Sequence, residues 1–376
     1  MDPLPLLRDL VAVNSVNPSL VPGAPGESAA AEVAAAAMRR AGLDVVMQEA
    51  APGRSNVIGV LEGRVAGPAV MFCGHLDTVG VEGMADPFTP RIADGRLYGR
   101  CAQDMKGGVA AMIAAAAVLA PAWSRGRLVV AAVVDEEFAS VGAEALVREW
   151  RADAAIVTEP TDLQVAIGHR GFAWIEIVTE GRAAHGSRPA EGRDAIAYMG
   201  RVLGALEARG RLLQGRPPTG VQGTASLHAS LITGGRELSS YPDRCVLQME
   251  RRTVSGETDH VIVGEVEQLL GELRRADPDC RASARLMTSR APYAIAETHA
   301  LPHALVAALA DRGRHDPATG MSFWTDAAIL GEAGIPSVLF GTTGAGLHSR
   351  EEYVDIESVT VCRDVLVDAT RRIIST

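Results

Sequence analysis

Short, wholly apolar segments alternate with a helix-like segment along the first part of this chain of 376 residues. The apolar segments are residues 70–73, 128–134 and 154–157, and an alanine-rich stretch that begins near Lys106 separates the first two. Runs of this kind are typical of strands that are buried on both faces. Because strands that are joined through helices pair in parallel by right-handed crossovers, the sequence predicts an α/β fold with a mostly parallel sheet and helices on both of its faces. Further predicted elements of this layer are a helix at 27–41, strands at 44–47, 56–61 and 337–340, and helices at 301–311 and 357–374.

The pattern changes after about residue 168, where apolar and polar residues begin to alternate as in half-exposed strands. Strands are predicted at 172–179, 225–232, 245–252 and 282–288, with amphipathic helices at 195–208 and 260–275. This β-α-β-β-α-β order is the split βαβ, or ferredoxin-like, plan. The sequence therefore predicts a small α+β domain at 169–294 that is inserted into a discontinuous domain at 1–168 and 295–376.

Charge and cysteine content exclude several classes of function. Lys and Arg total 36 against 46 Asp and Glu, for a net charge of −10, and no basic run offers a track for phosphates, so we expect no nucleic-acid partner. The uncharged stretch 107–123 is mostly alanine and short of a membrane span, and no signal segment is visible, so we expect a cytoplasmic protein without a membrane partner. The 5 cysteines lack metal-binding spacing and are expected to be reduced thiols.

Polar residues follow each buried run at the point where the predicted strand ends. His75 and Asp77 follow the first run, Glu136 and Glu137 the second, and Glu159 the third. Because the carboxyl ends of parallel strands meet at one edge of a sheet, we expect these side chains to converge there.

Two more residues are predicted to join this edge: Asp104, just before the alanine helix, and His348, after the last strand. Histidines and carboxylates suit one or two zinc-like ions, whose positive charge would offset the mutual repulsion of the acids. Asp77 can fix the tautomer of His75. Glu136 and Glu137 are neighbours that are expected to face opposite ways at the strand end, so one can bind metal while the other moves protons, as metal-assisted hydrolysis by a metal-bridging hydroxide requires.

At these residues the sequence resembles the M20 family of metallopeptidases and deacylases. The likeness runs through residues 14–18, 74–79, 104–108, 135–137, 159–160, 348 and 352–354. The resemblance implies two Zn²⁺ ions, for which Co²⁺ can substitute. It implies that one ion is held by His75, Asp104 and Glu159, and the other by Asp104, Glu137 and His348. It also implies Glu136 as the general base, with Asp77 behind His75.

In the inserted domain, residues 181–189 resemble the family's lid motif, which implies that His185 reaches the active site of a partner subunit and stabilises the oxyanion. The likeness implies a homodimer formed through this lid and dimerisation domain. Arg252 matches the arginine that binds a substrate carboxylate, and Ser239 and Gly344 are further predicted substrate contacts. Asp194, Cys101 and the segment 239–242 depart from the family's pattern.

Taken together, these features predict an amidohydrolase that cleaves the amide bond of an N-acyl amino acid, in the manner of acetylornithine deacetylase. Glu159 favours the deacetylase, desuccinylase and carboxypeptidase branches of the family. The alternatives are a carboxypeptidase or dipeptidase of the glutamate carboxypeptidase type, a succinyl-diaminopimelate desuccinylase, and a non-catalytic metal-binding member. An intact Glu136 argues against the last of these. Taken alone, His185 has an alternative interpretation as an ordinary loop histidine and Arg252 as a solvated edge residue.

Overall fold

The computed structural model describes residues 1–375 and divides the chain into two compact units. The larger unit contains residues 1–168, 295–319 and 325 onwards, and the smaller unit contains residues 169–294 and 320–324. The short segment 320–324, which the sequence analysis placed in the larger domain, therefore belongs to the smaller unit. Two short strands, β13 (Tyr293–Ala294) and β14 (Thr319–Met321), lie where the chain passes between the units.

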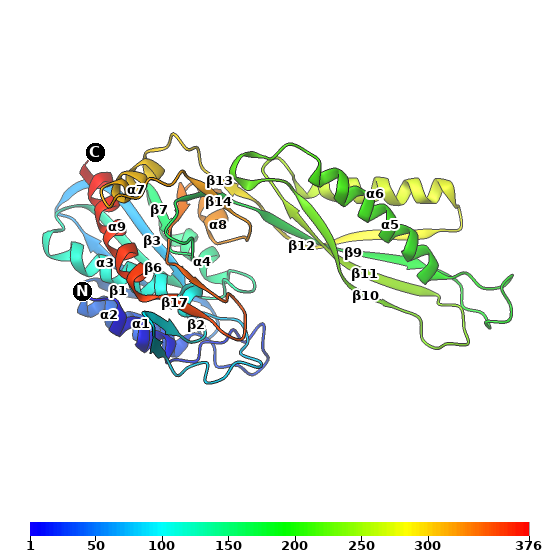
Figure 1. The fold of residues 1–376 in the computed structure, drawn as a ribbon, viewed down its shortest axis with the longest axis horizontal. Coiled ribbons are helices and arrows are strands. Elements are labelled where there is room, and N and C mark those ends of the chain that lie inside the picture. The colour runs from blue at the N-terminus through cyan, green and yellow to red at the C-terminus, as the bar shows by residue number, and fades with distance from the viewer. Residues whose placement is uncertain (376) are drawn as a thin grey trace. The chain divides into compact units, whose positions relative to one another are not determined.

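The larger unit is built on a sheet with the strand order β1-β2-β6-β3-β7-β15-β8 (Figure 1). Its strands are β1 (Asp44–Ala51), β2 (Arg54–Glu62), β3 (Val65–His75), β6 (Arg125–Val133), β7 (Ala154–Val157), β8 (Ala166–His169) and β15 (Ser337–Leu339). The strands β6, β3, β7 and β15 pair in parallel, as predicted. The flanking pairs β1·β2, β2·β6 and β15·β8 are antiparallel, so the parallel pairing is confined to the centre. At one edge, β1 and β2 are antiparallel because a tight hairpin between Ala51 and Arg54 joins them and leaves no room for a crossover connection.

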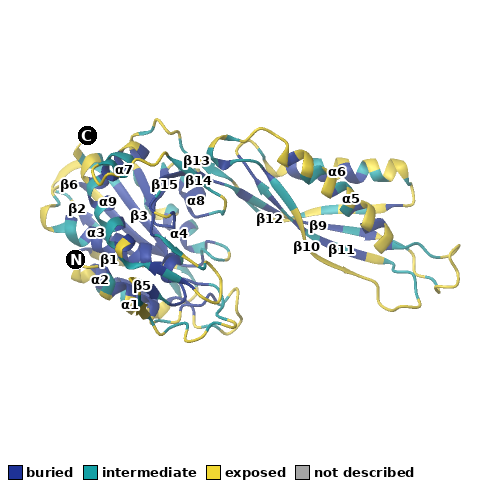
Figure 2. Cartoon of the chain, viewed as in Figure 1, coloured by how far each residue is buried: buried dark blue, intermediate teal, exposed yellow. Residues whose placement is uncertain are grey.

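Helices cover both faces of this sheet, as predicted. On one face α3 (Gly107–Leu119) packs on α9 (Ile356–Ser375), which also contacts α7 (Ala300–Ala310), and α2 (Ser28–Arg40) lies beside α3. On the other face α4 (Val141–Glu149) packs against α8 (Ala327–Glu332) (Figure 1). The stretch Ala102–Ala122, which contains α3, is long and apolar enough to cross a membrane, but 72% of its apolar 18-residue window is buried inside the protein. It is the core helix that its alanine content predicts, and Figure 2 shows it among the buried central strands.

Several short elements were not predicted from the sequence. They are α1 (Leu4–Val11), α8, and a small sheet of β4 (Arg91–Ala93), β5 (Arg96–Tyr98), β16 (Gly344–Ala345) and β17 (Tyr353–Asp355) in the order β16-β17-β5-β4. All the cysteines are free, as expected, and the structure shows that they are also buried.

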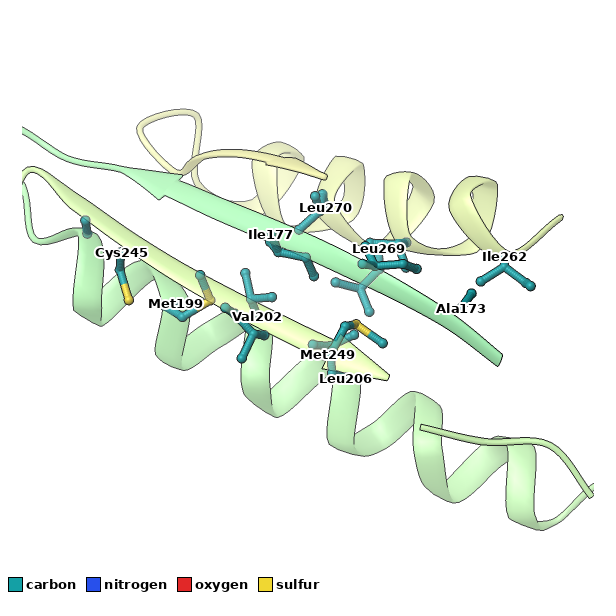
Figure 3. Packing of buried hydrophobic residues seen from close by; sticks show 14 residues of the cluster. Ala173, Ile177, Met199, Val202, Leu206, Cys245, Met249, Ile262, Leu269 and Leu270 are labelled. Atoms are coloured by element: carbon teal, nitrogen blue, oxygen red, sulfur yellow. The ribbon is translucent and has the colours of Figure 1, made fainter. Parts of the chain in front are cut away.

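The smaller unit has the predicted β-α-β-β-α-β order. Its elements are β9 (Gly171–Glu180), α5 (Ala195–Gln214), β10 (Ser226–Gly234), β11 (Arg244–Thr253), α6 (Asp259–Ala276) and β12 (Arg281–Arg290). The sheet order is β10-β11-β9-β12, and every pair is antiparallel. Alternate residues of β9 and β11, such as Ile177 and Met249, pack with α5 and α6 residues into one hydrophobic cluster (Figure 3).

Candidate active site

Three adjacent parallel strands bring the predicted acids and His75 to one edge of the sheet. His75 is the last residue of β3, Glu136 and Glu137 follow β6, and Glu159 follows β7. Glu136 and Glu137 do not alternate along an extended strand, as the sequence analysis assumed, because the chain turns there. Both carboxylates instead approach histidines: the distance from Glu136 Oε2 to His75 Nε2 is 4.0 Å, and from Glu137 Oε2 to His348 Nε2 it is 3.1 Å.

Asp77 is fully buried and fixes the geometry of this edge. Its carboxylate accepts hydrogen bonds from the backbone N–H groups of Glu136 (3.0 Å) and Glu137 (3.1 Å) and from the side-chain amide of Asn17 (2.8 Å). His75 Nδ1 lies 3.5 Å from Asp77 Oδ1 and 3.1 Å from the Asp77 backbone carbonyl. Burial alone would raise the pKa of Asp77, but the hydrogen bond with His75 and those from its other donors lower it. Asp77 therefore stays anionic and leaves His75 Nε2 directed at the other acids.

The side chains form two groups that meet at Asp104. In the first group, His75 Nε2 lies 3.3 Å from Asp104 Oδ1 and 4.0 Å from Glu159 Oε1. In the second, His348 Nε2 lies 3.2 Å from Asp104 Oδ2 and 3.1 Å from Glu137 Oε2. Within each group the donor atoms all lie within 4.8 Å of one another. Each oxygen of Asp104 thus faces a different histidine.

Both groups fit divalent metal ions of the zinc type, which take nitrogen and carboxylate ligands. Glu137 Oε1 is buried and has no hydrogen-bond partner among residues 1–375, which is costly for a carboxylate oxygen unless a cation lies nearby. Burial raises the pKa of Glu159 well above its usual value, and the charges of neighbouring acids add to this effect. Hydrogen bonds to Asp104 and Glu137 raise the pKa of His348 to about 10. Positive charge would therefore stabilise this cluster of acids.

Glu136 belongs to neither group. Its side chain is 11% exposed, and burial raises its pKa well above the usual range, with the charge of Glu159 as the next cause. A carboxyl group whose pKa is raised, held beside a metal site without binding the metal, suits proton transfer.

Glu352 holds the loop that carries Asp104. Its buried carboxylate accepts hydrogen bonds from the backbone N–H groups of Cys101 (3.0 Å), Gln103 (3.0 Å) and Asp104 (3.1 Å), and it pairs with Arg100 Nη1 at 2.8 Å. From the sequence, Glu352 is part of a motif but has no predicted role.

We expect Glu352→Ala to lower the free energy of unfolding by about 3–5 kcal/mol, because it leaves the buried guanidinium of Arg100 and three N–H groups without their acceptor. Urea unfolding followed by circular dichroism measures this loss. The exposed neighbour Glu351 provides the control, and an equal loss in Glu351→Ala would refute the assignment.

Several long-range side-chain contacts behind the acids could not be predicted from the sequence. Asp135 accepts from Asn17 Nδ2 at 3.0 Å and from Arg54 Nη1 at 2.7 Å, and Arg54 also pairs with the buried Glu27. Asp326 is 2% exposed, and its charge contributes to the raised pKa of Glu136. Asn17 and Asp135 lie in the motifs, but no local pattern marks Arg54 or Asp326.

His185 and Ser239 lie side by side in the smaller unit. The bridge between His185 and Ser240, together with the Gly186 N–H donating to the Ser239 carbonyl at 2.7 Å, ties the two loops. His185 is exposed, and its Nδ1 lies 2.8 Å from Ser187 Oγ.

Arg252 and Gly344 occupy strands of different units. Arg252 lies on β11, with Nε 3.1 Å from Glu250 Oε2. Gly344 lies in β16, where a Cβ atom would come 2.2 Å from the Tyr353 carbonyl oxygen, so glycine is needed there for backbone packing.

Two departures from the family's pattern have structural explanations. Asp194 caps α5, since its side chain accepts from the Ala197 N–H at 2.9 Å. Burial raises the pKa of the Cys101 thiol to about 12, so Cys101 is a buried thiol rather than a nucleophile.

Comparison with known proteins supports one family. The sequence model of peptidase family M20/M25/M40 matches residues 71–372. The chain is 30% identical to acetylornithine deacetylase of Myxococcus xanthus, over 98% of this chain and 97% of that protein. It is 29% identical to succinyl-diaminopimelate desuccinylase of Gluconacetobacter diazotrophicus, over 96% of this chain and 94% of that protein.

Solved structures share the fold at low sequence identity. A tripeptidase from Staphylococcus aureus has a TM-score of 0.82 at 20% identity, covering 100% of this chain and 98% of that one. The aminopeptidase PepT from Bacillus cereus has a TM-score of 0.81 at 18% identity, covering 99% and 98%. Together with the family match, these likenesses show that the chain belongs to peptidase family M20/M25/M40 and is a metal-dependent amide hydrolase.

Proposed function

We propose that this enzyme hydrolyses the amide bond of an N-acyl amino acid, as the name of its acetylornithine deacetylase relative describes for that protein. The observation that carries the proposal is the pair of donor groups that share Asp104, with Glu136 beside His75 of the first group but a member of neither. In this proposal His75, Asp104 and Glu159 hold one Zn²⁺ ion and Asp104, Glu137 and His348 hold the other, and Co²⁺ can replace Zn²⁺.

The ions would supply Lewis acidity, polarising the amide carbonyl and acidifying the attacking water. Glu136, which lies beside His75 without belonging to either donor group, accepts the proton of that water and delivers it to the leaving nitrogen. Asp77 keeps the backbone N–H groups of Glu136 and Glu137 in place and holds His75 in one orientation. Arg252 binds the carboxylate of the substrate, with Ser239 and Gly344 as further contacts.

A substrate panel tests this proposal. The protein is stripped with a chelator, reloaded with Zn²⁺ or Co²⁺, and assayed on N-acetyl amino acids, N-succinyl amino acids and dipeptides. We expect activity on N-acetyl amino acids that depends on added metal. Activity only on dipeptides would favour the carboxypeptidase or dipeptidase alternative, and activity only on N-succinyl compounds would favour the desuccinylase.

The edge strand β10 supports a homodimer formed through the smaller unit. It lies at one edge of the sheet, and most of its residues are exposed, including Leu231 (65%) and Ile232 (53%). A long exposed edge with apolar side chains readily pairs with another strand. In this homodimer His185 would stabilise the oxyanion in the partner's active site. The buried free cysteines favour the cytoplasm as its location.

Hybrid dimers test whether His185 acts across subunits. Mixing His185→Ala chains with Glu136→Ala chains under exchange conditions should restore activity, because one of the two sites then has both residues. We expect up to about a quarter of the wild-type rate from random mixing, measured as kcat per total protein. Mixtures that stay as inactive as either parent, although size-exclusion chromatography shows exchange, would contradict catalysis in trans.

A further inference from the structure

The smaller unit carries aromatic and charged side chains on one face of its sheet. Both of its helices pack on the opposite face, where Ala173 and Met249 belong to the hydrophobic cluster (Figure 3). Because side chains alternate along a strand, Phe172 and Trp174 of β9 and the neighbouring residues of β11 point away from that cluster. This open face is therefore aromatic and charged, unlike the apolar face that the helices cover.

Phe172, Trp174 and Trp324 form a continuous aromatic surface, which we name the aromatic platform. The rings of Phe172 and Trp174 lie 5.3 Å apart, and the Trp324 ring meets Phe172 edge-on at 6.2 Å. Trp174 is 43% exposed. Phe172 and Trp324 are partly buried, so the platform is a half-exposed aromatic cluster in a chain with only 4% aromatic residues.

Arg252 lies directly beside the platform, opposite Phe172 in the β11·β9 register. Its guanidinium carbon is 5.7 Å from the centre of the Phe172 ring. Glu250 holds Nε of Arg252 at 3.1 Å and also accepts from Trp174 Nε1 at 3.2 Å. Among residues 1–375 the ion-pair partner of Arg252 is Glu250, whose shortest contact is to Nε rather than to the two terminal nitrogens. They can bind one carboxylate in a bidentate manner.

We propose that the aromatic platform is the subsite for the substrate's amino-acid side chain, so that the enzyme prefers N-acyl derivatives of aromatic and large aliphatic amino acids. The inference rests on the proposed function, in which Arg252 binds the carboxylate. In an amino acid the side chain starts one atom away from the carboxylate carbon. A carboxylate on Arg252 therefore brings that side chain next to Phe172 and Trp174, where it buries apolar surface.

The charges around the platform disfavour a cationic side chain such as that of ornithine. The guanidinium of Arg252 lies over Phe172, and that of Arg290 lies 5.5 Å from the centre of the Trp324 ring. A substrate ammonium would meet positive charge at both places. The nearby acid, Glu250, already pairs with Arg252 and lies 3.8 Å from His228 Nδ1.

The test compares kcat/KM for the N-acetyl derivatives of phenylalanine, leucine, ornithine, glutamate and glycine with the metal-loaded enzyme. We expect phenylalanine and leucine to be preferred. Trp174→Ala should lower the phenylalanine-to-glycine ratio of kcat/KM by about 10- to 100-fold. Trp174→Phe, which keeps a ring but loses the bond to Glu250, should retain most of the ratio. Val178→Ala, on the same face of β9 outside the platform, is the matched control and should leave the ratio unchanged.

Preference for N-acetylornithine, or an unchanged ratio in Trp174→Ala, would overturn the inference while leaving the proposed hydrolysis intact. Calorimetric binding of the same compounds to the metal-loaded Glu136→Gln protein gives a second readout that needs no turnover. If the platform is the side-chain subsite, N-acetylphenylalanine should bind this variant more tightly than N-acetylornithine does. Equal or reversed affinities would also overturn the inference. Failure to hydrolyse any acyl amino acid or dipeptide would instead refute the proposed function.

Discussion

Replacing Glu136 by glutamine should lower kcat by about 10²- to 10⁴-fold with little change in KM, because the amide keeps the size of the carboxylate but cannot accept a proton. The side chain is outside both donor groups, so the variant should bind as much Zn²⁺ as the parent. The measurements are steady-state kinetics on the best substrate of the panel and metal content by atomic absorption.

The fold should survive this substitution. Burial and the charge of Glu159 both raise the pKa of Glu136, so a neutral group at this position removes repulsion rather than adding it. We expect the metal-free variant to have a melting temperature equal to or above that of the metal-free parent. Glu149→Gln, at an exposed position of α4, is the matched control and should keep full activity. A Glu136→Gln protein that loses metal along with activity would show that Glu136 is a ligand rather than the base.

The convergence of His75, Glu137 and Glu159 could be predicted from the sequence because it depends on regular geometry. Each residue lies at the carboxyl end of a buried strand, and β3 pairs in parallel with both β6 and β7. His348 is different. It lies in a loop with a positive φ of 57°, and only the resemblance to a known family assigned it to the second donor group.

Contacts that join distant segments could not be read from local patterns. The pairing of Arg54 with Glu27 and Asp135 connects β2 to two separate loops, and nothing in the spacing of these residues indicates it. The four hydrogen bonds of Glu352 could not be predicted either, since they require the loop at 100–104 to lie against the residue that precedes β17. Strands as short as β16 and β17 have too few residues to show a periodic pattern.

The turn after β6 shows that two predicted neighbours can come together through a local geometry different from the predicted one. An extended chain would have sent Glu136 and Glu137 to opposite faces of the sheet. The Asp77 carboxylate instead binds both of their backbone N–H groups and holds the chain in a turn. One buried acid thereby directs both carboxylates toward the same cluster of side chains, which neither residue's sequence position reveals.

Replacing Asp104 by alanine should weaken binding at both metal positions by about 100-fold or more, above the 10- to 100-fold cost typical of changes beyond the ligands themselves. Its Oδ1 lies with His75 and its Oδ2 with His348, so a single substitution removes a donor from each group. Glu159→Ala removes a donor from the first group alone and should leave one ion tightly bound.

Metal content after dialysis and the rise of melting temperature on adding Zn²⁺ distinguish the two variants. An ion that binds only the folded protein stabilises it, so the parent should show the full rise, Glu159→Ala a partial one and Asp104→Ala almost none. Asp104→Ala should still fold, because removing one acid relieves the repulsion that contributes to the raised pKa of Glu137. If both variants keep one ion with equal affinity, Asp104 does not bridge the two positions. Loss of both ions from Asp104→Ala alone would instead identify this carboxylate as the ligand that the two donor groups share.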